Sequence, residues 1–158
     1  MIVLQPIGIV RNSRHVVEDD RWGGIVSEIE VTEPFGPEGL TGIEEFSHAE
    51  VIFYFHRVEE DKIVTGARHP RNNPAWPQVG IWAQRGKNRP NRLGLAVVKI
   101  LQHEGKRLTV EGLDAIDGTP VVDIKPVMQE FLPQEVIRQP AWATELMTQY
   151  WQTASNKV

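Results

Sequence analysis

The residues best suited to chemistry in this 158-residue chain are arginines that crowd into one proline-rich stretch. Five of them fall within 25 positions: Arg68, Arg71, Arg85, Arg89 and Arg92. No acidic residue lies between them, so we predict guanidinium groups without protein partners. A guanidinium group meets a phosphate or carboxylate through two parallel hydrogen bonds. The stretch therefore predicts a site for an anionic ligand, although prolines in such loops often do no more than fix turns.

The charge of the chain is divided in the same way. Residues 62–107 hold ten of the seventeen Lys and Arg residues and one acid, Glu104, which makes this window +9. The remainder holds seven basic and twenty acidic residues, or −13, and the whole chain is −4. One surface thus suits an anionic partner, while the other surfaces repel it.

A second group of polar residues follows a turn signal, Asp117-Gly118-Thr119-Pro120. One interpretation is structural, with Asp117 capping its own turn and Asp123 paired with Lys125 on one face of a strand. In the other interpretation Asp123 is buried within an apolar run. A buried carboxylate needs a partner, so Asp123 would then meet a loop arginine or a ligand.

Other site chemistries have little support. The chain has no cysteine, and its five histidines are scattered without the spacing of metal ligands, so we predict no metal site. No serine stands in a Gly-x-Ser-x-Gly frame, and there is no Gly-x-Gly-x-x-Gly or P-loop motif. These absences leave serine hydrolases, Rossmann dinucleotide sites and P-loop nucleotide sites without a motif.

Short strands must hold these residues in place. Apolar alternation and turn signals predict strands at residues 3–11, 24–31, 49–58, 79–84, 93–103, 107–113 and 120–124, and an amphipathic helix at 141–153. Many short strands favour one mainly β domain, a barrel or a sandwich, with the helix docked on its sheet or on a second subunit. No apolar run is long enough to span a bilayer, and the first residues lack a signal-peptide pattern, so we expect a cytoplasmic protein.

Several motifs in a fixed order resemble one known family. They are His69-Pro70-Arg71, Gly80-Ile81-Trp82-Ala83-Gln84-Arg85, Arg89-Pro90-Asn91-Arg92-Leu93-Gly94-Leu95 and Asp117-Gly118-Thr119-Pro120-Val121-Val122-Asp123-Ile124-Lys125-Pro126. Over residues 7–126 the chain resembles the TrmO/TsaA-like (YaeB) family. The resemblance implies a small β-barrel rather than a Rossmann fold, at residues 1–130, with residues 131–158 as a C-terminal helical extension of the same domain. It also implies a homodimer with the site near the subunit interface.

The activity that the resemblance implies is S-adenosylmethionine-dependent methylation of tRNA, at N6 of threonylcarbamoyladenosine beside the anticodon. It implies no metal. Carried over by motif, the methyl-donor positions are His56, Arg57, Arg85, Leu95, Leu113 and Asp114; the catalytic positions are Asp123, Lys125 and Arg89; and the acceptor positions are Arg71, Lys87, Asn91, Arg92 and Asp117.

The chain departs from the family pattern near the acceptor. Gly86-Lys87 stands where Ser-Pro is common, Arg92 replaces a second proline, Ala96 a serine and Val127 a tyrosine. Two alternatives to tRNA methylation therefore stay open. One is a methyltransferase acting on a small molecule or another RNA, and the other is a non-catalytic module that binds S-adenosylmethionine or RNA.

Overall fold

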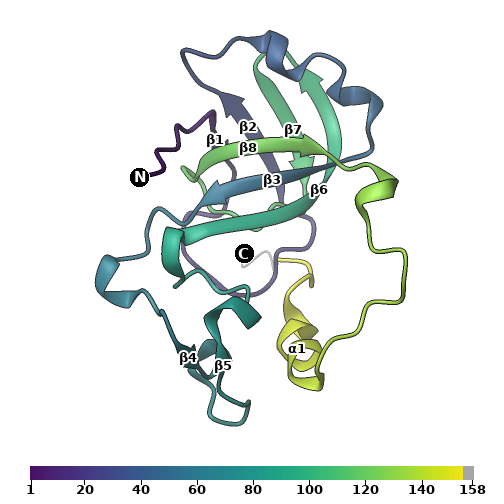
Figure 1. The fold of residues 1–158 in the computed structure, drawn as a ribbon. Helices are drawn as coiled ribbons and strands as arrows, with labels where there is room; N and C mark the ends of the chain where they lie inside the picture. The colour runs from purple at the N-terminus through teal and green to yellow at the C-terminus, as the bar shows by residue number, and fades with distance from the viewer. Residues whose placement is uncertain (155–158) are drawn as a thin grey trace.

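Antiparallel strands close into a barrel in the computed structural model, which describes residues 1–154 (Figure 1). The strands are β1 (Gly8–Arg11), β2 (Val26–Val31), β3 (His48–Tyr54), β6 (Leu93–Glu104), β7 (Arg107–Glu111) and β8 (Pro120–Pro126). Their order around the barrel is β1-β2-β7-β6-β3-β8, and β8 pairs with β1 to close the ring. The predicted mainly β barrel is thus confirmed.

Strand β6 joins the two halves of the barrel because it is long enough to pair on both sides in turn. Its first part pairs with β3, from Leu93 opposite Tyr54 to Lys99 opposite His48. Its second part pairs with β7, with a bulge between Ile100 and Gln102. A bulge bends the strand and increases its twist, which helps a small sheet to close.

The barrel core follows the alternation of the sequence. In β2 every second side chain points inward, since Ser27, Ile29 and Val31 are buried. Each of the six barrel strands contributes fully shielded aliphatic side chains, which include Val10, Ile29, Val51, Val98, Leu108, Val110 and Val121. Each such side chain contributes about 1.5–3 kcal/mol relative to an exposed one, so burial of this set stabilises the barrel.

The basic stretch, residues 66–95, contains a second, two-stranded sheet that the sequence did not predict. It consists of β4 (Ala67–Arg68) and β5 (Val79–Gly80). The predicted strand at 79–84 was therefore too long, because a 3₁₀ turn at Ile81–Ala83 ends it. The side-chain amide of Gln84 donates to the carbonyls of Arg68 and Val79, at 3.0 and 2.8 Å, and secures the small sheet without further strand pairing.

Short 3₁₀ turns make up most of the remaining regular structure. They are η1 (Pro37–Leu40), η2 (Ile43–Glu45), η3 (Glu60–Lys62), η4 (Pro70–Asn72), η5 (Ile81–Ala83), η6 (Pro90–Arg92), η7 (Gln129–Phe131) and η8 (Met147–Gln149). Proline begins η4 and η6, where its fixed φ suits the first position of a turn.

The C-terminal segment forms a shorter helix than predicted. Helix α1 spans Ala141–Leu146, and η8 follows it in place of a continuous helix to residue 153. The segment then returns to the barrel, where the backbone N–H of Trp22 donates to the carbonyl of Tyr150 at 2.8 Å. Gly23 is required at this contact, since an added Cβ would overlap the carbonyl oxygen of Trp151.

The predicted extension 131–158 includes residues 155–158, which lie outside the described residues. Within residues 1–154, no helix has both the length and the apolar character needed to cross a membrane.

Candidate functional site

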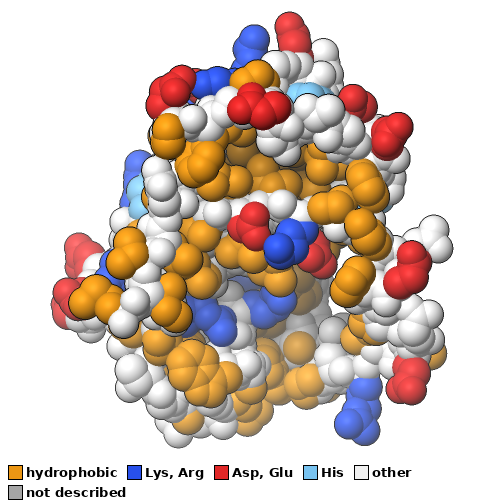
Figure 2. All heavy atoms as spheres, turned by 45° about the horizontal axis from the view of Figure 1, so that its top comes forward, with side chains coloured by type: hydrophobic (Ala, Val, Ile, Leu, Met, Phe, Trp, Pro, Cys, Tyr) orange, Lys and Arg blue, Asp and Glu red, His pale blue; other side chains and the backbone are white. Residues whose placement is uncertain are grey.

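A cavity of about 1610 Å³ opens beside one end of the barrel. Its lining comes from the ends of β3 and β6, the basic stretch with its small sheet, and the C-terminal segment with α1, together with the β1–β2 and β7–β8 connections. In Figure 2 a hollow contains Lys and Arg side chains in its depth and hydrophobic side chains around it. The volume exceeds the 300–1,000 Å³ typical of a pocket for one small ligand, so there is room for two partners.

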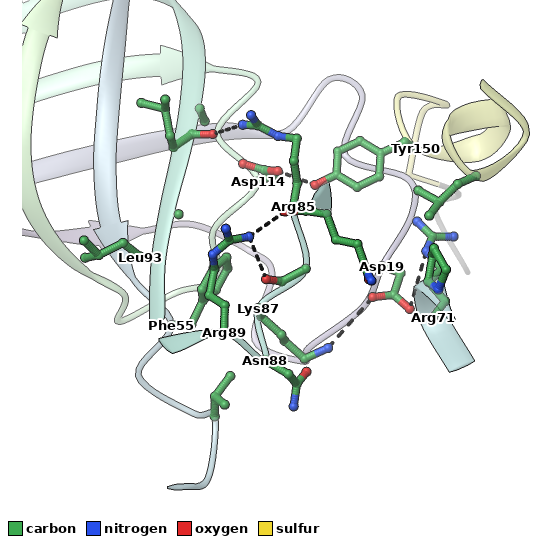
Figure 3. A pocket seen from close by; sticks show the side chains of 18 of the residues that line it. Asp19, Phe55, Arg71, Arg85, Lys87, Asn88, Arg89, Leu93, Asp114 and Tyr150 are labelled. Carbon is green, nitrogen blue, oxygen red and sulfur yellow. Dashed lines mark hydrogen bonds and ion pairs between the residues drawn. The ribbon is translucent and has the colours of Figure 1, made fainter. Parts of the chain in front are cut away.

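Arginines of the basic stretch point into this cavity (Figure 3). Arg85 donates through Nη2 to the carbonyl of Leu95 on β6, at 2.6 Å. Arg89 donates through Nη1 to the carbonyl of Gln84, at 2.7 Å. Each guanidinium group uses one nitrogen to hold the local backbone, which leaves other N–H groups available to an anion.

Two of the predicted site residues that line the cavity, Arg71 and Lys87, lie close to acids. Arg71 forms a bidentate hydrogen bond with Asp20, at 2.9 and 3.1 Å, and its Nε lies 4.0 Å from Asp19. Lys87 lies 3.9 Å from Asp19. The prediction of unpaired arginines was therefore wrong for Arg71. Asp20 lies 51 residues before Arg71 in the chain, so inspection of flanking residues does not reach it.

The turns that present these residues carry unusual backbone conformations. Arg71 and Asn72 in η4, and Asn91 and Arg92 in η6, have φ between 50 and 63°. Residues other than glycine rarely adopt such φ values, and each one that does costs of order 1–3 kcal/mol. Such strain clusters at binding sites, which is consistent with a functional role for both turns.

Asp114 and Tyr150 form a polar pair in the wall of the cavity (Figure 3). The Tyr150 hydroxyl donates a hydrogen bond to Oδ2 of Asp114, whereas Oδ1 is shielded from solvent and has no hydrogen-bond partner among the described residues. Burial raises the pKa of Asp114, against the opposing effects of the Tyr150 hydrogen bond and the Arg85 charge. Burial, and then the Asp114 charge, raises the pKa of Tyr150, so this phenol remains a donor at neutral pH.

His56 follows the end of β3 and also lines the cavity. Burial and the neighbouring Arg57 charge lower its pKa, which favours the neutral imidazole at pH 7. Arg57 donates through Nη1 to the carbonyl of His15, at 2.9 Å. His56 is thus available as a neutral donor or acceptor rather than as a cation.

Most predicted site residues meet at this one cavity. Those that line it are His56, Arg57, Arg71, Arg85, Lys87, Arg89, Asn91, Leu95 and Asp114. The lining of this cavity, among residues 1–154, does not include Leu113, Arg92, Asp117, Asp123 or Lys125.

Three of the outlying residues have other contacts. The Leu113 side chain is fully buried in the barrel core. Arg92 donates to the carbonyl of Val58 at 3.0 Å and lies over the Tyr54 ring. Asp117 accepts a hydrogen bond from the backbone N–H of Asn12 at 3.1 Å, in addition to its place in the turn.

Asp123 and Lys125 form an ion pair of 3.1 Å on the outer face of β8. The Asp123 side chain is 45% exposed, so the prediction that it is buried was wrong. The alternative, a same-face strand pair, is what the structure contains. The β-bulge between β3 and β8 beside Ile52 shifts the alternation of inward and outward side chains, so Asp123 lies on the outer face although the run around it is apolar.

Reasoning from the sequence missed several residues of the cavity. Tyr150 and Trp22 both line it, and neither had a predicted role in a site. Asp19 had no predicted role, although the run Glu18-Asp19-Asp20 is an acidic signal that complements the basic stretch.

These features define a class: a small β-barrel protein with a cavity, between its basic loops and the barrel end, that suits an anionic ligand. Similarity to known proteins narrows the class. The profile described as "tRNA-methyltransferase O N-terminal domain" matches residues 18–131. The chain belongs to this family, which confirms the predicted TrmO/TsaA-like resemblance.

Relatives of known name agree with this assignment. A protein of Pyrococcus abyssi named "Probable S-adenosyl-L-methionine-binding protein" is 35% identical over 143 residues, 87% of this chain and 74% of that protein. The Homo sapiens protein named "tRNA (adenine(37)-N6)-methyltransferase" is 38% identical over 99 residues, 62% of this chain and 22% of that protein.

A solved structure, that of TrmO from Pseudomonas aeruginosa, superposes with a TM-score of 0.72 at 27% identity. The superposition covers 90% of this chain and 62% of that one. An Archaeoglobus fulgidus relative, also named "Probable S-adenosyl-L-methionine-binding protein", is covered over 34% of its length. This chain therefore spans between about a fifth and three quarters of the length of these relatives.

Proposed function

We propose that this protein is an S-adenosylmethionine-dependent methyltransferase that methylates adenine N6 in tRNA. The observation that carries the proposal is the cavity, because one space combines a buried polar pair, an arginine and an apolar strand end with a rim of basic loops. The names of the relatives in Pyrococcus abyssi and Homo sapiens support a methyl donor and a tRNA acceptor, respectively.

The residues present fit the methyl donor. Its carboxylate suits the guanidinium group of Arg85, and its N–H and O–H groups suit the unpartnered Oδ1 of Asp114. Leu95 gives an apolar surface for the adenine ring. The neutral imidazole of His56 adds no positive charge that would repel a sulfonium centre.

The acceptor would enter along the basic stretch. Lys87 and Arg89 suit phosphate groups, and Asn91 suits a base edge. Arg71 would bind a phosphate in exchange for Asp20. The bound donor supplies an electrophilic methyl group, and the protein residues align it with the acceptor nitrogen and exclude water. Little acid–base work is required of the protein, since the amine proton can leave after transfer.

We further propose threonylcarbamoyladenosine beside the anticodon as the nucleoside, on the motif resemblance. The roles of Asp123, Lys125, Arg92 and Asp117 toward the acceptor remain predictions, as does that of Leu113 toward the donor. If Asp123 accepts the N–H bond of the acceptor amine, Asp123→Asn lowers kcat with little effect on affinity for the donor product.

A homodimer in the cytoplasm is also part of the proposal. Leu95, Val97 and Leu101 form a row of exposed apolar side chains on β6, between 43 and 52% exposed, and Leu95 continues into the cavity. A second copy that covers this row would adjoin the cavity. Analytical ultracentrifugation tests the dimer, and a monomer at all concentrations contradicts it.

Calorimetric titration with S-adenosylmethionine and with S-adenosylhomocysteine tests the donor site. We expect both to bind at sub-millimolar concentration, and absence of binding by both would contradict the proposal. If both bind but hypomodified tRNA is not methylated, a small-molecule or other RNA acceptor, or a non-catalytic binding role, replaces the tRNA reaction.

A further inference from the structure

The carboxyl group of Asp114 is only half satisfied by the protein. The residue belongs to the segment between β7 and β8 and lines the cavity. One oxygen, Oδ2, accepts the hydrogen bond from the Tyr150 hydroxyl. The other, Oδ1, is shielded from solvent without a partner among residues 1–154. An unsatisfied buried polar atom costs about 1–3 kcal/mol, so the arrangement favours a ligand that donates to Oδ1.

Tyr150 reaches Asp114 from far along the chain. It lies 36 residues later, beyond the segment 18–131 that the family profile matches. Its backbone carbonyl accepts the N–H of Trp22, and its ring packs edge-to-face on Trp151 with centroids 5.0 Å apart. The ring also packs against the buried cluster formed by Trp22, Ile25 and Ile116. These contacts give the phenol a defined position relative to the barrel.

The direction of the Tyr150–Asp114 hydrogen bond is determined by chemistry. When Asp114 is ionised, its carboxylate has no proton and the neutral phenol has one, so the tyrosine donates. That bond occupies Oδ2 and restricts rotation of the carboxyl group. The remaining acceptor is then Oδ1, in the same wall of the cavity as Arg85 (Figure 3).

We propose that Tyr150 is the positioning residue of the methyl-donor site: its hydroxyl group orients the Asp114 carboxylate so that Oδ1 accepts a hydrogen bond from an N–H or O–H group of the bound sulfonium nucleoside. This inference rests on the proposed function, because it requires that nucleoside in the cavity. It assigns to the C-terminal segment a part in the site that the barrel alone lacks.

The charges that face this pair come from two other segments. Burial raises the pKa of both Asp114 and Tyr150; the Arg85 charge opposes this rise for both residues, and the Arg71 charge opposes it for Tyr150. His56 is a further titratable group in the same cavity. The Tyr150 hydrogen bond itself lowers the pKa of Asp114, so its loss raises that pKa further. Asp114 then becomes protonated at a higher pH than in the unchanged protein.

The test is titration of the full chain with S-adenosylhomocysteine across pH, for Tyr150→Phe, Asp114→Asn and the double variant. Tyr150→Phe keeps the ring and removes only the hydroxyl. We expect it to weaken binding about tenfold at neutral pH, and to move the acid limb of the affinity profile to higher pH. In the Asp114→Asn background the same change should have little further effect. The contribution of His56 is common to all variants and cancels in these comparisons.

The matched control is Tyr54→Phe, because Tyr54 is the other tyrosine of the chain and does not line the cavity. We expect this variant to bind like the unchanged protein. The inference is overturned if Tyr150→Phe binds with unchanged affinity and an unchanged pH profile. It is also overturned if the effects of Tyr150→Phe and Asp114→Asn add independently, since Tyr150 would then not act through Asp114. If the unchanged protein itself binds no S-adenosylhomocysteine, the proposed function fails first.

Discussion

Replacing Arg85 by alanine separates ligand binding by this side chain from its contribution to folding. In the protein Arg85 makes one hydrogen bond, to the carbonyl of Leu95 at 2.6 Å, and its charge opposes the rise that burial causes in the pKa of Asp114. The side chain lines the cavity. Among residues 1–154, no carboxylate oxygen lies within 4.0 Å of its guanidinium nitrogens, so it forms no ion pair there. Its removal therefore affects a ligand more than it affects the barrel.

The expected magnitudes differ enough to measure. The bond from Arg85 to the carbonyl of Leu95 is exposed to solvent, so its loss lowers the free energy of unfolding by only about 0.5–1.5 kcal/mol. Loss of a charge-assisted bond to the donor carboxylate weakens binding by about 1.5–3 kcal/mol, which is roughly 10- to 150-fold in Kd. Without the Arg85 charge, the pKa of Asp114 also rises, which weakens binding further toward low pH.

Calorimetric titration with S-adenosylhomocysteine and urea unfolding measure the two effects on the same sample. Arg92→Ala is the matched control, because Arg92 also donates to one backbone carbonyl, at 3.0 Å, but does not line the cavity. We expect it to lose comparable stability and to keep its affinity for this ligand. The reasoning is refuted if Arg85→Ala binds as well as the unchanged protein, or if its loss of affinity only follows its loss of stability.

Three further predictions concern the barrel, its pH dependence and the basic rim. Gly94→Ala should destabilise the fold by about 1–3 kcal/mol, because an added Cβ would lie 2.5 Å from the buried Phe53 ring; Gly80→Ala, with nothing within 4 Å, should not, and equal urea midpoints would count against this packing argument. The hydrogen bond with Glu44 raises the pKa of His103. Protonated His103 therefore stabilises the folded protein fully below about pH 6.5, and this stabilisation is lost as the pH rises through the pKa of the folded state. His103→Gln should therefore lower Tm at pH 6 more than at pH 9, and a uniform decrease would contradict that sign. Lys87→Gln should reduce the salt slope of RNA binding by about one, and an unchanged slope would remove Lys87 from the RNA contact.

Local patterns in the sequence predicted the barrel well because each strand carries its own signal. The alternation around Ile29 and the turn before Pro120 are each formed by a few neighbouring residues. The strands predicted from them closely match the observed β2 and β8. In the small sheet only β5 had such a signal, as part of the strand predicted at 79–84, and β4 had none. Strands of two residues show no periodicity, and the amide of Gln84 holds this pair from outside it.

The site was predictable only where a motif or a local charge pattern marked it. Arg85 and Asp114 stand in motifs, and both line the cavity. The Arg71–Asp20 and Tyr150–Asp114 contacts join residues 51 and 36 positions apart. Helical spacing around Tyr150 indicates a packed face but not which polar group the hydroxyl meets, so only the folded chain reveals the pair.

The most direct test of the account is nucleoside mass spectrometry of tRNA that lacks the N6 methyl group, incubated with the protein and S-adenosylmethionine. We expect the threonylcarbamoyladenosine peak to decrease as a product one methyl group heavier appears, and Asp114→Asn to slow this conversion strongly. An unchanged nucleoside profile with protein that demonstrably binds S-adenosylhomocysteine would contradict tRNA as the methyl acceptor.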